Sequence, residues 1–120
     1  MSEQIGWCVE LAIQPGQFDS FIELTREMVA ETAAEPGVLA YQRFISNDGQ
    51  IVHAVERYES SDAALGHLRT FQQQFAERFS SMVTRRRFSV YGTPSAELKA
   101  MLDGFGAIYF SRLGDLGYCP

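Results

Sequence analysis

The residue of this sequence best suited to acid–base chemistry is His67. A histidine ordinarily titrates at about pH 6.5, so it can take and return a proton close to neutral pH. His67 is therefore a candidate general base; the alternative is a histidine that is hydrogen-bonded or solvated on a short surface helix. The other histidine, His53, has no carboxylate or thiol at metal-ligand spacing. We expect His53 to be structural and predict no metal site.

Glu56 is the second candidate for a catalytic residue. If its segment is a strand, Glu56 shares one face with Ala54 and Tyr58. Burying a carboxylate alone costs several kcal/mol, so this group should be paired or functional. The sequence leaves two alternatives open, which are an ion pair with Arg43 or Arg87 and a catalytic role.

Four aromatic residues with polar groups fall in strand-like segments, namely Trp7, Tyr41, Tyr58 and Tyr91. Aromatic side chains in a small domain usually belong to the core. If a cleft lies between sheet and helices, however, these residues could clamp a flat aromatic ligand and hydrogen-bond its oxygens. Arg43, Trp7 or a tyrosine hydroxyl could also stabilise an anionic form of that ligand. We expect these five residues to bind substrate.

The first elements that must position these residues are a strand and a helix. Residues 5–13 carry apolar side chains at alternate positions and stop at Pro15-Gly16, which predicts a strand. Apolar residues then recur on one side and predict an amphipathic helix of about four turns. Pro36-Gly37 ends it, because Pro disfavours a helical residue before it and Gly tolerates a turn. The apolar face of this helix should comprise Phe18, Phe21, Ile22, Met28 and Val29.

Two helix signals follow later in the chain. Ser60 and Ser61 can cap a short helix that runs through Leu68. Thr70 begins a Thr-x-x-Gln pattern, a capping box that predicts a second helix. Residues 87–91 then predict a strand. The second helix should present one apolar stripe made of Phe71, Phe75, Phe79 and Met82.

Residues 38–45 and 51–58 are rich in β-branched and aromatic side chains and flank Asp48-Gly49, which predicts a hairpin. The complete order is strand, helix, strand, strand, helix, strand. This order is typical of a ferredoxin-like α+β sandwich, with an antiparallel four-stranded sheet and helices on one face. Residues 38–45 are apolar at both strand parities, so both sheet faces should be covered and we predict a homodimer. The two apolar sets are Val38, Ala40 and Phe44, and Leu39, Tyr41 and Ile45.

These elements occupy residues 1–93, and residues 94–120 form a C-terminal extension. Ser95 can cap a helix that ends at Gly104. Residues 105–110 are too apolar for a free tail. The extension should therefore pack on the domain or on a partner subunit.

With 120 residues, 46% of them hydrophobic, the chain fits one small globular domain. Its formal charge of −5 argues against nucleic acid or an anionic membrane surface as a partner. The one basic run, Arg85-Arg86-Arg87, should alternate between the two faces of a strand and be solvated or ion-paired. Cys8 and Cys119 fit no disulfide framework, and no leader or membrane span is present, so we expect a cytoplasmic protein.

The order of several short segments resembles the antibiotic biosynthesis monooxygenase family over roughly residues 5 to 93. These segments are Glu35-Pro36-Gly37-Val38-Leu39-Ala40-Tyr41, Glu56-Arg57-Tyr58, Ala63-Ala64 and His67. The family pattern also places a histidine at His67 and a glutamate at Glu56. The resemblance implies a dimeric α+β barrel that oxidises electron-rich phenols, quinols or anthrones with dioxygen, without metal, flavin or haem. The chain carries no Gly-rich phosphate loop, GxSxG motif or dinucleotide fingerprint, in agreement with this expectation of no cofactor.

The implied mechanism begins when a base, His67 or Glu56, removes a phenolic proton. The phenolate then gives one electron to dioxygen, and the radical pair recombines to a hydroperoxide that loses water and leaves a quinone. Proton transfer from an ordinary phenol to a histidine costs roughly 5 kcal/mol, so the site must stabilise the anion or the substrate must be more acidic. Haem degradation is not expected. The resemblance implies that a haem-degrading relative would carry a tryptophan and a histidine at about the two positions where this chain has His67 and Glu77 instead. The alternative from another class is a non-catalytic dimeric barrel that binds a hydrophobic molecule or serves as an accessory subunit.

Overall fold

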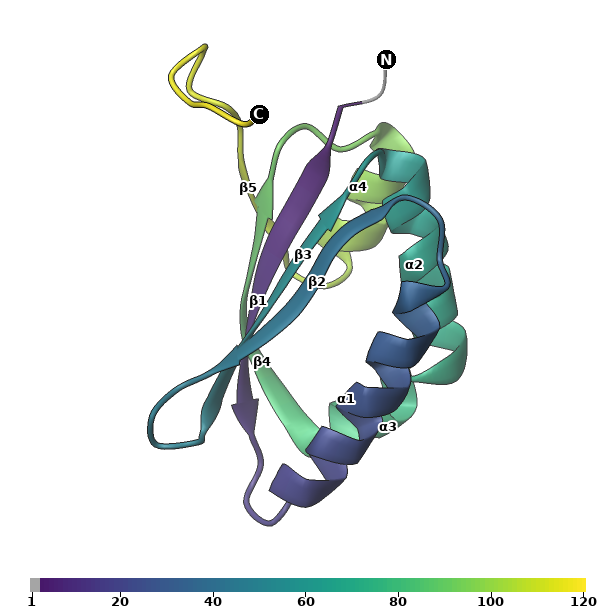
Figure 1. Cartoon of the computed structure of the whole chain (residues 1–120), viewed down its shortest axis with the longest axis vertical. Coiled ribbons are helices and arrows are strands. Elements are labelled where there is room, and N and C mark those ends of the chain that lie inside the picture. Colours follow the sequence, from purple (N-terminus) through teal and green to yellow (C-terminus); the bar gives the residue numbers. More distant parts are fainter. Residues whose placement is uncertain (1–2) are drawn as a thin grey trace.

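The sheet and the helices form two layers in the computed structural model, which describes residues 3–120 (Figure 1). Four helices lie on one face of a five-stranded sheet, and no helix of these residues covers the opposite face. The elements in chain order are β1 (Ile5–Ile13), α1 (Phe18–Ala33), β2 (Val38–Ile45), β3 (Ile51–Tyr58), α2 (Ser61–Gln74), α3 (Ala76–Met82), β4 (Val83–Tyr91), α4 (Ala96–Asp103) and β5 (Ile108–Phe110).

The strands follow the order β2-β3-β1-β4-β5 across the sheet. Every neighbouring pair is antiparallel except β4 and β5, which are parallel. The predicted ferredoxin-like α+β fold is confirmed, but the sheet has a fifth strand in addition to the predicted four. Three residues are too few for a strand periodicity to be recognised. The strand β5 therefore depends on its pairing with the edge of β4, where Ser89 lies opposite Ile108 and Tyr91 opposite Phe110.

Two register shifts decide which side chains face the helices. In β2 the pairing with β3 shifts between Val38 and Ala40, so Val38 and Ala40 do not share a face as strict alternation predicted. Beyond this shift, Tyr41 lies opposite Glu56 and Arg43 opposite Ala54. The shift thus brings Tyr41 and Arg43 to the helix-covered face of the sheet.

The second shift lies between β1 and β4. Leu11 pairs with Arg85 and Glu10 with Arg87, so Arg86 has no partner in this ladder. Alternation along the basic run predicted Arg85 and Arg87 on the same face. The extra residue places them on opposite faces, with Arg85 beside inward-facing residues and Arg87 on the face without helices.

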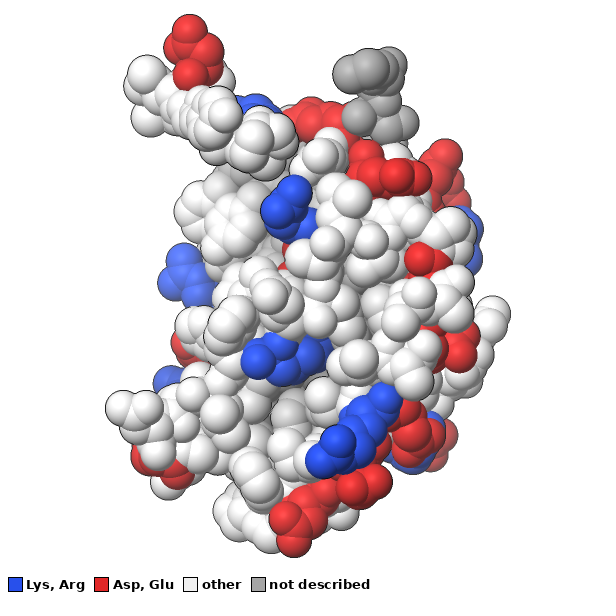
Figure 2. Space-filling model, viewed as in Figure 1, with Lys and Arg blue, Asp and Glu red and all other residues white. Residues whose placement is uncertain are grey.

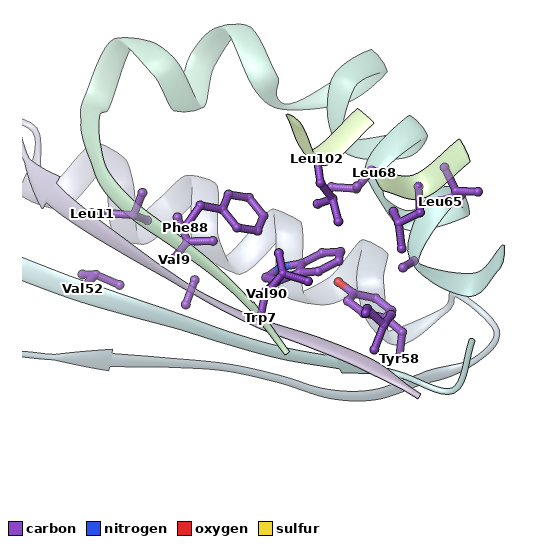
Figure 3. Packing of buried hydrophobic residues seen from close by; sticks show 14 of the residues in the cluster. Trp7, Val9, Leu11, Val52, Tyr58, Leu65, Leu68, Phe88, Val90 and Leu102 are labelled. Carbon is purple, nitrogen blue, oxygen red and sulfur yellow. The ribbon is translucent and has the colours of Figure 1, made fainter. Parts of the chain in front are cut away.

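The core fills the space between the sheet and the helices (Figure 3). Trp7 and Tyr58 are almost completely buried, and their ring centroids are 4.8 Å apart. Leu65 and Leu68 of α2 and Leu102 of α4 face these strand residues in Figure 3. The remaining buried members of this cluster include Ile5, Val9, Leu11, Phe21, Val52, Ala54, Val83, Phe88, Val90 and Leu98.

The helices differ from the sequence-based predictions in two respects. In α1 the buried residues are Phe21, Leu24, Met28 and Thr32, whereas Phe18 and Val29, predicted on the apolar face, are 45% and 42% exposed. The predicted boundary at Thr70 is absent, because α2 continues to Gln74 and α3 begins after Phe75. The residues between Leu68 and Phe71 include no Pro or Gly that would end a helix. The helix α2 therefore continues through the Thr-x-x-Gln pattern that begins at Thr70. Ser60 does cap α2 as predicted, since its hydroxyl accepts a hydrogen bond from the amide of Ala63.

The C-terminal extension begins with the predicted capped helix. Ser95 accepts a hydrogen bond from the amide of Leu98, and Leu98 and Leu102 are fully buried in the core. Residues 94–110 are therefore packed on the rest of the chain. Beyond them the chain has little cover, and Leu113, Leu116 and Tyr118 are highly exposed.

Charged side chains of both signs are interspersed on the face shown in Figure 2. On that face, the described residues form no continuous basic surface of the kind that binds a phosphate backbone. None of the helices formed by residues 3–120 is both long enough and apolar enough to span a membrane.

Candidate active site

A pocket opens between the inner face of the sheet and the helices. Its cavity volume is about 50 Å³. One group of lining residues is apolar, and consists of Val9, Leu11, Met28, Ala54, Leu68, Phe71, Phe79, Phe88 and Phe105. The other group can form hydrogen bonds or carries charge, and consists of Trp7, Tyr41, Arg43, Glu56, His67 and Arg85. Such a combination of apolar walls and a few polar groups is typical of small-molecule sites.

Glu56 is the centre of a hydrogen-bond network in this pocket. It lies opposite Trp7 on β1 and opposite Tyr41 on β2. Its Oε1 atom accepts hydrogen bonds from Nε1 of Trp7 at 2.9 Å and from the hydroxyl of Tyr58 at 2.6 Å. Its Oε2 atom accepts one from Arg43 at 3.0 Å. Of the two ion pairs that the sequence allowed, the one with Arg43 therefore forms, while Arg87 lies on the other face of the sheet.

These contacts limit what Glu56 can do. Its side chain is 6% exposed, and three protein donors already occupy its two oxygens. Glu56 is therefore placed to hold Trp7, Tyr58 and Arg43 in position.

His67 lies on α2 and is buried, in contrast to the solvated alternative considered from the sequence. Its Nδ1 atom is 2.7 Å from Oε1 of Glu35, and its Nε2 atom is 3.5 Å from Oε1 of Glu56. The ring packs against Tyr41 and Tyr58, with centroid distances of 5.3 Å to each. Since Glu35 occupies Nδ1, Nε2 is the nitrogen that can exchange a proton in the pocket.

Sequence reasoning did not identify Glu35 as a site residue. It follows α1, and the turn at Pro36-Gly37 brings it against His67, which lies 32 positions later in the chain. The sequence feature that pointed to Glu35 was its position as the first residue of the segment Glu35–Tyr41, which resembles the family. Its Oε2 atom is buried and has no hydrogen-bond partner among the described residues. Among the described residues, the side-chain partner of this carboxylate is therefore the imidazole of His67.

Tyr58, which is buried, and Tyr41, which is partly buried, both remain protonated at neutral pH. Burial is the main cause that raises the pKa of Tyr58 far above its usual value, and the adjacent Glu56 carboxylate raises it further. Burial also raises the pKa of Tyr41, and the nearby Arg43 guanidinium opposes this effect. That guanidinium lies 3.5 Å from the centroid of the Tyr41 ring, in a cation–π contact. Both hydroxyl groups are consequently hydrogen-bond donors rather than bases.

The structure brings together most of the predicted site residues, but not all. Trp7, Tyr41, Arg43, Glu56 and His67 line one pocket, and the buried Tyr58 supports it through Glu56. The structure does not bring Tyr91 to this pocket.

Tyr91 is half exposed on the face of the sheet without helices, where its ring centroid is 5.8 Å from that of Phe110. His53 lies on that same face, and its Nε2 atom is 3.0 Å from Oε1 of Glu10.

The sequence analysis also did not identify Arg85 or four phenylalanines as pocket residues. These phenylalanines are Phe71, Phe79, Phe88 and Phe105. Among residues 3–120, no three His, Cys, Asp or Glu side chains are arranged to hold a metal ion.

Three structures with the same fold were compared with the chain. MupZ from Pseudomonas fluorescens is 20% identical, with 99% of this chain and 94% of that chain covered and a TM-score of 0.76. A conserved protein from Methanosarcina mazei Go1 is 18% identical, with 74% and 91% covered and a TM-score of 0.67. A variant of SnoaB, a cofactor-independent oxygenase from Streptomyces nogalater, is 14% identical, with 79% and 97% covered and a TM-score of 0.66. These similarities establish the fold.

A comparison with curated proteins gave no match. The family comparison was decisive, because a sequence model described as antibiotic biosynthesis monooxygenase matches residues 6–78. This match covers more than half of the chain and confirms the resemblance seen in the segments around Glu35, Glu56 and His67. The chain belongs to the antibiotic biosynthesis monooxygenase family.

Proposed function

We propose that this protein is a cofactor-independent monooxygenase that oxidises an electron-rich phenol, quinol or polyketide-type aromatic with dioxygen. The observation that carries this proposal is the placement of His67. Glu35 holds its Nδ1 atom at 2.7 Å, and the ring lines a pocket with aromatic walls. A carboxylate in this position fixes the tautomer of the imidazole and stabilises the imidazolium that forms when Nε2 takes a proton.

In this proposal a hydroxyl group of the substrate binds near Nε2 of His67, which removes its proton. Arg43 is close to the same network, and its charge would stabilise the resulting phenolate. Such stabilisation matters because transfer of a proton from an ordinary phenol to a histidine costs roughly 5 kcal/mol. An acidic polycyclic phenol or anthrone would reduce that cost further.

The phenolate then supplies the electrons for oxygen chemistry. It transfers one electron to dioxygen, and the two radicals combine to form a carbon–oxygen bond and a hydroperoxide. Breakage of the O–O bond and loss of the C–H proton release water and leave a quinone. One oxygen atom enters the product and the other enters water, so the substrate supplies all four electrons and no external reductant is needed.

A second candidate function is supported by the walls of the pocket. Four phenylalanines and Met28 line it, and such a surface can hold a hydrophobic molecule without changing it. The protein would then be a non-catalytic barrel or an accessory subunit. Turnover measurements separate this candidate from the first.

We also propose that the protein is a homodimer and works in the cytoplasm. Six large apolar side chains of the described strands are substantially exposed, namely Leu39, Phe44, Ile45, Tyr91, Ile108 and Phe110. A second copy would cover the sheet face that lacks helices. Both cysteines are free, which supports a reducing compartment.

Oxygen uptake with a panel of naphthohydroquinones and anthrones tests the proposed reaction. The assay should use metal-stripped protein and compare the wild type with His67→Gln and with His53→Gln. His53 is the matched control, because it also pairs with a carboxylate but lies on the opposite face of the sheet. We expect turnover in the wild type and in His53→Gln, and little above background in His67→Gln.

Several results would count against the proposal. If ligands from the panel bind but no oxygen is consumed, the non-catalytic barrel becomes the better function. If chelation abolishes turnover and one particular metal restores it, the reaction is not cofactor-independent. Equal turnover in the two histidine variants would remove His67 from the mechanism.

A further inference from the structure

Arg85 is the charged residue of the pocket that has no partner of opposite charge. Arg43 pairs with Glu56, and His67 lies 2.7 Å from Glu35. No carboxylate of the described residues lies within ion-pair distance of Arg85. Its observed contact is with the ring of Phe105, whose centroid is 5.2 Å from the guanidinium carbon.

The neighbouring arginines of the same run are engaged elsewhere. Nε of Arg86 is 3.9 Å from a carboxylate oxygen of Glu10, and Arg87 donates a hydrogen bond to Ser89 at 3.2 Å. The register shift opposite Glu10 and Leu11 turns Arg85 alone toward the pocket. Partial desolvation lowers the pKa of Arg85 from its usual value. Arg85 is nevertheless exposed overall, and a guanidinium that reaches a pocket without a counter-charge is suited to bind an anion.

The position of Arg85 relative to the acid–base network defines the ligand more closely. Arg85 lies opposite Leu11 on β1, whereas Glu56 lies opposite Trp7 on the same strand. Four residues of strand separate these positions, which corresponds to about 13 Å along the sheet. The floor of the pocket thus has the hydrogen-bond network toward one end and an unpaired positive charge toward the other. Apolar and aromatic side chains lie between them.

We propose that Arg85 binds a carboxylate on the substrate, which is therefore a fused-ring aromatic acid with its reactive hydroxyl at the opposite end. The carboxylate accepts hydrogen bonds from the guanidinium, and the ring system lies between the phenylalanine walls. This orientation brings the hydroxyl to His67. The inference rests on the proposed function for the identity of the pocket as the substrate site, but its test measures binding and needs no turnover.

Trp7 provides the signal for that test, because it is the only tryptophan and it lines the pocket. Quenching of its fluorescence should be titrated with anthracene-2-carboxylic acid and with the methyl ester of the same acid. The ester keeps the rings and removes the negative charge. We expect the wild type to bind the acid about tenfold or more tightly than the ester, as is usual for a charge-assisted contact.

The three consecutive arginines supply matched variants. Arg85→Ala should lose most of the preference for the acid while changing the affinity for the ester less than about threefold. Arg85→Lys should keep part of the preference, because lysine keeps the charge but not the two-pronged geometry. Arg87→Ala should bind both compounds as the wild type does, since Arg87 lies on the other face of the sheet. Added salt should weaken binding of the acid more than binding of the ester.

The alternative outcomes are equally clear. If the wild type shows no preference for the acid, or binds neither compound, Arg85 does not recognise a carboxylate. If Arg85→Ala keeps the preference, or weakens both compounds equally, the proposal is also wrong. A preference that depends on Arg85 in a protein that consumes no oxygen would support the carboxylate site and reject the proposed reaction.

Discussion

Oε1 of Glu35 lies 2.7 Å from Nδ1 of His67, so a carboxylate at the end of one helix orients an imidazole on another. The contact is part-buried, and it determines which nitrogen of the ring faces the pocket. If His67 is the base, Glu35 is a positioning residue that acts through it.

Glu35→Gln should lower the rate of oxygen uptake by about 10- to 100-fold while the fold is kept, because the amide can orient the ring wrongly and does not stabilise an imidazolium. The maximal rate should fall more than the affinity for substrate. Glu10→Gln is the matched control, since Glu10 contacts His53 at 3.0 Å on the opposite face. Equal rates in Glu35→Gln and Glu10→Gln would show that the contact has only a structural role.

His67→Ala should lower the rate by about 100-fold or more, because general base catalysis is typically worth that much. The measurement is the rate of oxygen uptake at saturating substrate. Loss of the ring also leaves the partly buried Glu35 without its partner, which destabilises the fold. His67→Gln retains an amide donor for Glu35 and is the better-folded test, so an unchanged rate in His67→Gln would exclude His67 as the base.

The sequence was sufficient for the main elements because their signals are local. Alternation along residues 5–13, the Asp48-Gly49 turn and the break at Pro36-Gly37 each lie within a short window. They led to the ferredoxin-like α+β fold that the structure shows. The strand β5 and the boundary between α2 and α3 are decided by packing with distant elements, which no local window contains.

One part of the candidate site could be predicted from the sequence, because a buried carboxylate needs a partner. Glu56 on an apolar strand face was expected to be paired or functional, and it does pair with Arg43. Glu35 was missed because its contact with His67 joins two separate helical regions across 32 positions. Arg85 was missed because a register shift, which alternation cannot reveal, directs it into the pocket.

Gly37→Ala should destabilise the protein and disturb the site. Gly37 has a φ of 81°, and a Cβ atom there would lie 2.6 Å from the Cβ atom of Ala63 on α2. This close approach of the turn to α2 is part of what sets the distance between Glu35 and His67. Gly49 is the matched control, because its φ is 74° but nothing lies within 4 Å of the added atom.

The free energy of unfolding in urea separates the two effects in these variants. Gly49→Ala should cost about 1 to 2 kcal/mol, the usual cost of a left-handed conformation for an alanine. Gly37→Ala should cost about 1 to 3 kcal/mol more, because the steric overlap is added to that strain. Equal losses in the two variants would mean that the turn can move away from α2 without cost.

Phe44→Glu should convert the proposed dimer to a monomer. Phe44 is 55% exposed on the sheet face without helices, opposite His53. A charge there would be buried without a partner if a second copy covers this face. Val29→Glu is the control, because Val29 is 42% exposed on α1 in the helical layer. Light scattering at micromolar concentration should find a dimer for the wild type and Val29→Glu; a wild-type monomer would end the homodimer proposal.

The stability of the fold should decline at alkaline pH because of the buried tyrosines. A tyrosine in the unfolded chain titrates at about pH 10, whereas burial and the Glu56 carboxylate raise the pKa of Tyr58 in the folded chain. Above pH 10 the folded state therefore holds a proton that the unfolded state has lost. Stability is fully present below this pH and should fall by up to about 1.4 kcal/mol per pH unit for each such tyrosine as the pH rises.

Urea unfolding of the wild type and Tyr58→Phe, measured from pH 8 to well above 10, tests this expectation. At pH 8 the variant should be less stable by about 1 to 3 kcal/mol, because Glu56 loses one of its donors. Above pH 10 its stability should decline less steeply than that of the wild type, since one titrating group has been removed. The double variant with Tyr41→Phe should show a smaller decline still, because burial raises the pKa of Tyr41 as well. An identical alkaline slope in the wild type and both variants would show that these hydroxyl groups titrate alike in the folded and unfolded chains, and that the network around Glu56 is open to solvent.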